Sequence, residues 1–223
     1  MSGLVLRVEE LLRGGADAAE VATGRTLRDW ALILIAAGLA YGSVMGSFAG
    51  IGGERILQVV YSAAKVPLLL MVSFGASLPS FFVISTLLGV REDFREVLGA
   101  LVATQARLTL VLLALAPYTA FWYACSSDYA HALLFNGGMF ALASFTAQWV
   151  LHRRYMPLIK RNRRHRLLLR IWLVIYVFVG IQMAWVLRPF VGDPTLPVQF
   201  FRKEAWGNAY EVVGRLIWRA IAD

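Results

Sequence analysis

Cysteine and acidic residues are scarce in this chain. The single cysteine, Cys125, excludes an internal disulfide and any cysteine-rich metal site. Asp and Glu together number only 14 in 223 residues, and none of them falls within a confidently apolar stretch. Transporters that couple to protons or cations usually place a carboxylate near the middle of the bilayer. The sequence therefore argues against ion-coupled transport, whereas carbonyls or hydroxyls alone could still line a pore.

Catalytic signatures are missing as well. The sequence contains no P-loop and none of the patterns GxGxxG, GxSxG or HExxH. Of the three histidines, two lie in a strongly basic segment. The third, His131, has only Asp128 and Tyr129 nearby as further ligands, which is too few for a zinc site. We therefore predict a non-enzymatic protein without a metal site, and no residue pattern identifies a cofactor.

Apolar residues dominate what is present. They make up 59% of the chain, charged residues reach only 16%, and the mean hydropathy is +0.63. Soluble domains carry about 45–50% apolar and about 25% charged residues, and a transmembrane helix needs about 20 mostly apolar residues. We predict an all-α, polytopic helical membrane protein with about five transmembrane helices. The qualifying segments are 30–50, 66–90, 98–125 or 104–125, 130–151 and 167–187.

The flanks complete the predicted organisation. Residues 1–29 form a cytoplasmic arm, residues 30–190 the five-span transmembrane domain, and residues 191–223 an external loop and a C-terminal helix. Apolar residues near both ends recur at helical spacing, which predicts an amphipathic helix at each end. Each of these helices suits either the membrane surface or a neighbouring subunit. The apolar faces consist of Leu4, Val8, Leu11 and Leu12 in the arm, and of Trp206, Tyr210, Val213 and Ile217 in the tail.

A basic segment, His152–Arg166, separates the last two predicted spans, and we expect it to be a short loop. Eight of the 22 Lys and Arg residues lie between Arg153 and Arg170, whereas residues 126–129 contain none. Cytoplasmic loops carry an excess of Lys and Arg, so this asymmetry predicts a cytoplasmic N-terminus and an external C-terminus. It also favours membrane anchoring over nucleic-acid binding. The segment offers a surface for anionic lipids, made of Arg153, Arg154, Lys160, Arg161, Arg163, Arg164 and Arg166.

A stripe of four glycines runs along the first predicted span. Gly38, Gly42, Gly46 and Gly50 recur at every fourth position, so they fall on one face of a helix. Without side chains on that face, another helix can approach closely. The stripe predicts a helix-packing surface, either within the chain or between subunits.

The second and third spans contain features that could form a cavity. Pro67 and Pro79 interrupt the second span, and a broken helix either lines a solute site or is a structural kink. Arg107 is deeply buried in the membrane if the third span begins near Leu98. If the span begins near Thr104, the Arg107 side chain extends to the inner headgroups, and we expect this second arrangement. Candidate cavity or lipid contacts are Lys65, Pro67, Pro79, Gln105, Arg107, Asn136, Gln182 and Arg188.

Three short segments carry a resemblance to known proteins. Residues 182–194 (QMAWVLRPFVGDP), 65–70 (KVPLLL) and 78–80 (LPS) resemble an uncharacterised group of bacterial polytopic inner-membrane proteins. The five-span layout with a cytoplasmic N-terminus also resembles the Yip1-type membrane family. This resemblance implies a multi-pass protein of the bacterial inner membrane and assigns no catalytic residue.

Two functions follow as hypotheses from these observations. The glycine stripe, the terminal helices and the carboxylate-free spans favour a non-enzymatic scaffold or accessory subunit of a larger membrane assembly. Its partners would be other membrane subunits or further copies of the chain, together with the bilayer and its anionic lipids. The alternative is a channel or uncoupled transporter built around the proline-broken second span. An enzyme acting on lipid ranks third, because no nucleophile–base pair is evident.

Overall fold

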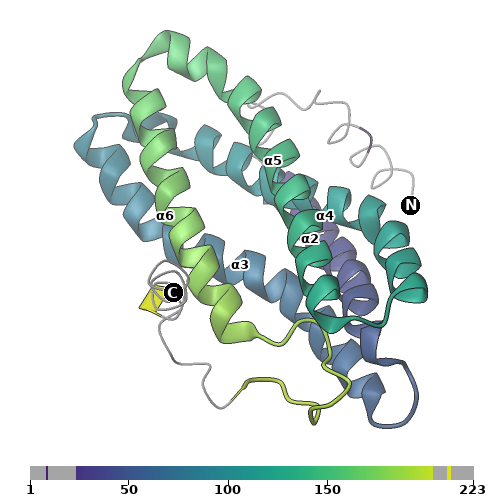
Figure 1. Cartoon of the computed structure of the whole chain (residues 1–223). Helices are drawn as coiled ribbons and strands as arrows, with labels where there is room; N and C mark the ends of the chain where they lie inside the picture. Colours follow the sequence, from purple (N-terminus) through teal and green to yellow (C-terminus); the bar gives the residue numbers. More distant parts are fainter. Residues whose placement is uncertain (1–8, 10–23, 203–209, 212–223) are drawn as a thin grey trace, which may run out of the picture.

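The fold is a bundle of long helices (Figure 1). The structure, a computed structural model, describes residue 9, residues 24–202 and residues 210–211. Within these ranges it contains no strand, which confirms the all-α fold class. The helices are α2 (Gly24–Gly46), α3 (Arg55–Leu87), α4 (Phe94–Cys125), α5 (Tyr129–Arg161) and α6 (Arg164–Leu187), with short 3-10 turns η2 (Ser47–Ala49) and η3 (Arg91–Asp93).

All five of these helices are long and apolar enough to cross a membrane. The three longest, α3 to α5, contain 33, 32 and 33 residues. At a helical rise of about 1.5 Å per residue each is about 50 Å long, whereas the hydrocarbon core of a bilayer is about 30 Å thick. These helices therefore extend beyond the hydrocarbon core unless they tilt strongly. The apolar faces of the predicted terminal helices lie outside the described residues, apart from Tyr210.

Several predicted boundaries were wrong in the same direction. Helix α3 begins at Arg55 rather than near Val66, and α5 continues past Leu151 to Arg161. The basic segment is therefore not a loop, because only a turn at residues 162–163 separates α5 from α6. Hydropathy locates the part of a helix that lies in lipid. The helix itself continues wherever the following residues, such as Arg, Leu and Lys, favour helix.

Helix α2 joins the two halves of the bundle. It packs along both α3 and α4, α4 packs against α5, and α3 packs against α6. Helices α5 and α6 are consecutive in the sequence but meet mainly at their turn, and Figure 1 shows them diverging below it. The two arms of this hairpin are thus held apart by the helices behind them.

Three of the four stripe glycines lie where α2 meets α3. A Cβ atom at Gly42 would lie 2.4 Å from the Ser62 carbonyl oxygen, and one at Gly46 would lie 2.8 Å from Ser62 Cβ. A Cβ at Gly38 would approach Pro67 to 3.2 Å. The expectation for Gly50 was wrong: it follows η2 with a φ of 94°, and an added Cβ would meet nothing within 4 Å. The stripe therefore serves packing inside the chain over three of its four positions.

A buried amide links α2, α4 and α5 near one end of the bundle. Asn136 Nδ2 donates to the Tyr123 hydroxyl (2.6 Å) and to the Ala132 carbonyl (2.8 Å). The Tyr41 hydroxyl donates to Asn136 Oδ1 (3.2 Å), and Tyr123 donates to the Met45 carbonyl (3.3 Å). Each polar atom of the Asn136 side chain thus has a partner.

Substitution of this amide tests its contribution to stability. We expect Asn136→Leu to lower the free energy of unfolding by about 1–2 kcal/mol, since hydrogen bonds between transmembrane helices contribute about that much. Unfolding in mixed detergent–denaturant micelles measures the change. Thr146→Val is the matched control, because the Thr146 hydroxyl bonds only carbonyls of its own helix. Equal stability of the two variants would contradict the role of Asn136.

Candidate binding cleft between α5 and α6

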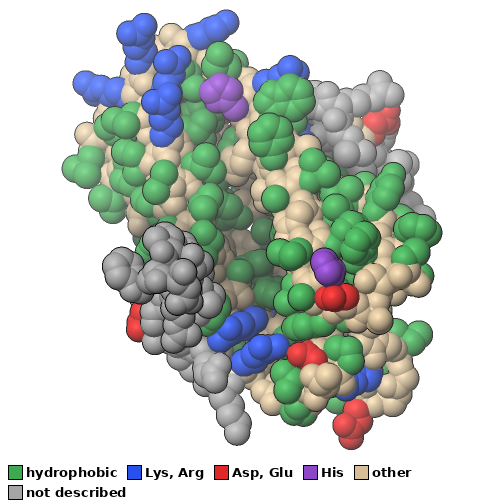
Figure 2. Space-filling view, viewed as in Figure 1, with side chains coloured by type: hydrophobic (Ala, Val, Ile, Leu, Met, Phe, Trp, Pro, Cys, Tyr) green, Lys and Arg blue, Asp and Glu red, His purple; other side chains and the backbone are tan. Residues whose placement is uncertain are grey.

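The diverging hairpin leaves a cleft of about 440 Å³ between α5 and α6. Figure 2 shows a hollow on this face, with hydrophobic side chains around it. Helices α3 and α4 close its back. The cleft is lined by Met45, Leu69, Leu70, Ser73, Leu108, Leu133, Asn136, Gly137, Phe140, Ser144, Gln148, Leu173, Tyr176, Val177, Gly180, Ile181, Ala184 and Phe190. It opens on the side of the bundle (Figure 2).

Glycines widen the cleft on both of its walls. Gly137 on α5 and Gly180 on α6 line it, and a Cβ atom added at either would meet nothing within 4 Å. At Gly42, by contrast, the backbone of α3 occupies the space that a side chain would need. The open glycines leave space that no part of the described chain fills.

The few polar groups of the cleft are hydroxyls and amides. Ser73 is only 1% exposed, and its Oγ has no hydrogen-bond partner among the described residues. The Tyr176 hydroxyl donates to Gln105 Oε1 (2.8 Å), which joins α6 to α4. Among the residues that the structure describes, no carboxylate, imidazole or thiol lines the cleft. Its chemistry suits binding of an apolar molecule, with Ser73 as a buried polar atom available to it.

The chain after α6 covers one end of the cleft. Phe190 and Met45 line the cleft at this end, and the backbone of the segment is held by a polar stripe on α3. Lys65 Nζ donates to the Pro189 carbonyl (2.7 Å) and lies 4.9 Å from the centre of the Phe200 ring. The hydroxyl of Ser62 donates to the Phe190 carbonyl. We call residues 188–202 the covering segment.

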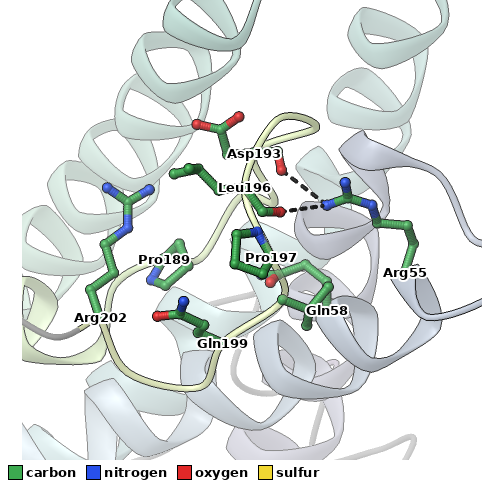
Figure 3. Close-up of a pocket in the computed structure, with 9 residues that line it drawn as sticks. Arg55, Gln58, Pro189, Asp193, Leu196, Pro197, Gln199 and Arg202 are labelled. Atoms are coloured by element: carbon green, nitrogen blue, oxygen red, sulfur yellow. Dashed lines mark hydrogen bonds between the residues drawn. The ribbon is translucent and has the colours of Figure 1, made fainter.

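Arg55 completes this attachment at the start of α3. Its guanidinium donates to the carbonyls of Asp193 (3.0 Å), Pro194 (2.6 Å) and Leu196 (3.1 Å). Figure 3 shows two of these bonds beside a surface pocket of about 240 Å³, with Arg202 on the opposite side. The hydroxyl and the backbone N–H of Thr195 donate to the Asp193 carboxylate, which lowers the pKa of Asp193. Arg55 and Lys65 thus hold the backbone of the covering segment.

At the opposite end, the turn between α5 and α6 is tied to η3. Arg161 pairs with Asp93 and lies 3.7 Å from a Glu96 carboxylate oxygen. The buried His165 has its Nε2 2.9 Å from Asp93 Oδ2 and its Nδ1 3.4 Å from the Tyr155 hydroxyl. The Arg164 guanidinium donates to the carbonyl of Leu88 (3.0 Å), the residue that caps the C-terminus of α3. Part of the predicted lipid surface is therefore occupied by structural contacts.

The predicted cavity residues do not form one site. Asn136 lines the cleft, and Gln105 lies behind it, bonded to Tyr176. Pro67 is buried against Gly38, whereas Pro79 is exposed and does not line the cleft. The remaining residues lie elsewhere. Lys65 is under the covering segment. The guanidinium of Arg188 lies 3.4 Å from the centre of the Trp185 ring. Gln182 is half-buried outside the cleft.

The expected position of Arg107 was wrong. Helix α4 begins at Phe94, so Arg107 lies thirteen positions further on, about 20 Å along the helix axis. Its side chain is 4% exposed. Charges shorten the apolar run in residues 94–104, but Val97, Ala100 and Leu101 are buried in a core shared with α3, α5 and α6. Arg107 is therefore an interior residue and does not reach the bundle surface.

Sequence reasoning missed most of the cleft. Ser73, Tyr176, Gly137 and Gly180 were not singled out, because isolated serines, tyrosines and glycines are common in membrane helices. A signal was nevertheless present in the small and polar residues that recur at helical spacing along α5, namely Asn136, Gly137, Ser144 and Gln148.

The described residues contain no group of three or more His, Cys, Asp or Glu side chains arranged to hold a metal ion. Comparisons of the chain with protein families, curated proteins and solved structures gave no match.

Proposed function

We propose that this chain is an integral membrane scaffold or accessory subunit that binds other components and catalyses no reaction. The observation that carries the proposal is the apolar cleft between α5 and α6, which opens on the side of the bundle. A cleft lined by hydroxyls, amides and apolar side chains offers recognition but no acid, base or nucleophile. Many large apolar side chains elsewhere are exposed as well, which suits contact with lipid or with neighbouring subunits.

The proposal includes an orientation. The region around the turn between α5 and α6 carries eight of the 22 Lys and Arg residues, between Arg153 and Arg170, and would face the cytoplasm. The covering segment would then lie on the external side. Arg55 and Lys65 are compatible with this placement, because both donate to backbone carbonyls there. A bacterial inner membrane is the location that the sequence resemblance suggests.

Extraction from native membranes into polymer-bounded nanodiscs tests the proposal. We expect the particle to contain at least one further polypeptide in fixed ratio to this chain, as measured by native mass spectrometry. A particle with a single copy of this chain and no other polypeptide would contradict the scaffold function. Solute flux into liposomes holding only this chain, reduced by Pro79→Ala or Arg107→Gln, would favour the channel alternative instead.

A further inference from the structure

We infer that the cleft between α5 and α6 binds one acyl chain of an anionic phospholipid, whose headgroup lies beside Arg166 and Arg170. This inference goes beyond the scaffold function and does not depend on protein partners. It rests on the size of the cleft, on its buried polar atom and on the charges that follow it along α6.

The dimensions of the cleft match an acyl chain. On α6 its lining extends from Leu173 to Ala184, which is about 16 Å along the helix. Half of the hydrocarbon core, the depth that one leaflet fills, is about 15 Å. The cleft, of about 440 Å³, is thus long enough to hold one acyl chain along α6.

The charges at one end of the cleft match an anionic headgroup. Arg166 and Arg170 lie seven and three positions before Leu173, where the lining on α6 begins, so they continue the same face of the helix. Both side chains are exposed, and neither guanidinium forms a hydrogen bond or ion pair with the described residues. Nearby, Arg161 already takes up the acidic side chains of Asp93 and Glu96. The two free arginines therefore present positive charge where the chain of a cytoplasmic-leaflet lipid would begin.

The interior of the cleft has a polar atom for a lipid to satisfy. Ser73 Oγ is buried and lacks a hydrogen-bond partner among the described residues. Gly137 and Gly180 leave open space on the two walls beside it. An unsaturated acyl chain would fill this space and offer the Ser73 hydroxyl the weak π acceptor of its double bond, whereas an empty cleft leaves both unmet.

Titration of the delipidated full chain with lipid, followed by native mass spectrometry, tests the inference. The probes are palmitoyl-oleoyl phosphatidylglycerol and palmitoyl-oleoyl phosphatidylcholine. We expect one phosphatidylglycerol to bind more tightly than any further lipid. Gly180→Leu and Gly137→Leu should abolish this tight binding, because a leucine at either position enters the cleft. Gly75→Leu is the matched control: Gly75 is also helical and open, but it does not line the cleft.

Charge variants test the headgroup separately. Arg166→Gln with Arg170→Gln should weaken phosphatidylglycerol binding by about tenfold or more, since each cation near an anionic headgroup contributes about 1 kcal/mol, which corresponds to about fivefold. The control is Lys160→Gln, an exposed cation on the far side of α5 from the cleft. Thermal unfolding of every variant confirms that the bundle is intact.

Three results would overturn the inference. One is equal affinity for phosphatidylcholine and phosphatidylglycerol. Another is tight lipid binding that survives both leucine substitutions. The third is photo-crosslinking from residue 181 to a polypeptide instead of lipid, which would identify a partner helix as the occupant. Tight phosphatidylglycerol binding by a solitary chain would support the inference even if the scaffold function failed.

Discussion

We expect Gly42→Ala to lower the thermal stability of the purified protein sharply. A Cβ atom at residue 42 would lie 2.4 Å from the Ser62 carbonyl oxygen and 2.8 Å from Ala63 Cα. Both atoms belong to the backbone of α3, so α2 and α3 must separate to admit the methyl group. Overpacking of a core usually costs about 1–3 kcal/mol and occasionally more. The midpoint of thermal unfolding in a mild detergent measures the effect.

Gly75→Ala is the control for this experiment. It makes the same chemical change within α3, at a position where a Cβ would meet nothing within 4 Å. We expect its unfolding midpoint to stay the same or to rise slightly, because alanine favours helix over glycine by about 1 kcal/mol. If the two variants unfolded at the same temperature, the close contact between α2 and α3 would be refuted.

Lys65→Met releases the covering segment from α3. The substitution keeps the length of the side chain but removes the donor that binds the Pro189 carbonyl and the charge beside the Phe200 ring. A hydrogen bond to a charged group contributes about 1.5–3 kcal/mol, and the buried carbonyl would lose its partner. We therefore expect faster cleavage within residues 188–202 by an added protease, together with a lower unfolding midpoint.

Lys160→Met serves as the comparison for this variant. Lys160 is an exposed cation near the end of α5, so its loss changes the net charge equally. It should leave the cleavage rate of the covering segment unchanged. If cleavage accelerated to the same extent in both variants, the effect of Lys65 would be one of charge alone rather than of its bond to Pro189.

The membrane-spanning part of the fold could be predicted from the sequence, because apolar runs of sufficient length have few alternatives. All five predicted spans are helices, and α6 ends at Leu187 as Pro189 requires. The helix extensions at Arg55 and Arg161 could not be predicted in the same way. They lie outside the apolar runs, and tertiary contacts rather than hydropathy keep them helical.

The candidate site was largely beyond the sequence. The cleft exists because α5 and α6 diverge, and that angle depends on how α3 and α4 pack behind them. A single helix pattern contains no information on such an angle. Lys65 illustrates the difficulty in another way. In the sequence, a lysine beside an apolar run indicates only a membrane boundary. In the structure, its ammonium group binds the carbonyl of Pro189, 124 positions away.

The distance in sequence between Lys65 and Pro189 also sets the order in which the molecule is completed. Ribosomes add about 5–20 residues per second, so the partner of Lys65 is synthesised about ten seconds after it. Until then Lys65, Ser62 and Arg55 have no carbonyls of the covering segment to bind. During that interval the first four spans can already be in the bilayer, with this end of α3 still hydrated. Attachment of the covering segment is consequently a late step of biogenesis, and a chain truncated before residue 188 would retain its spans but leave that end of the cleft uncovered.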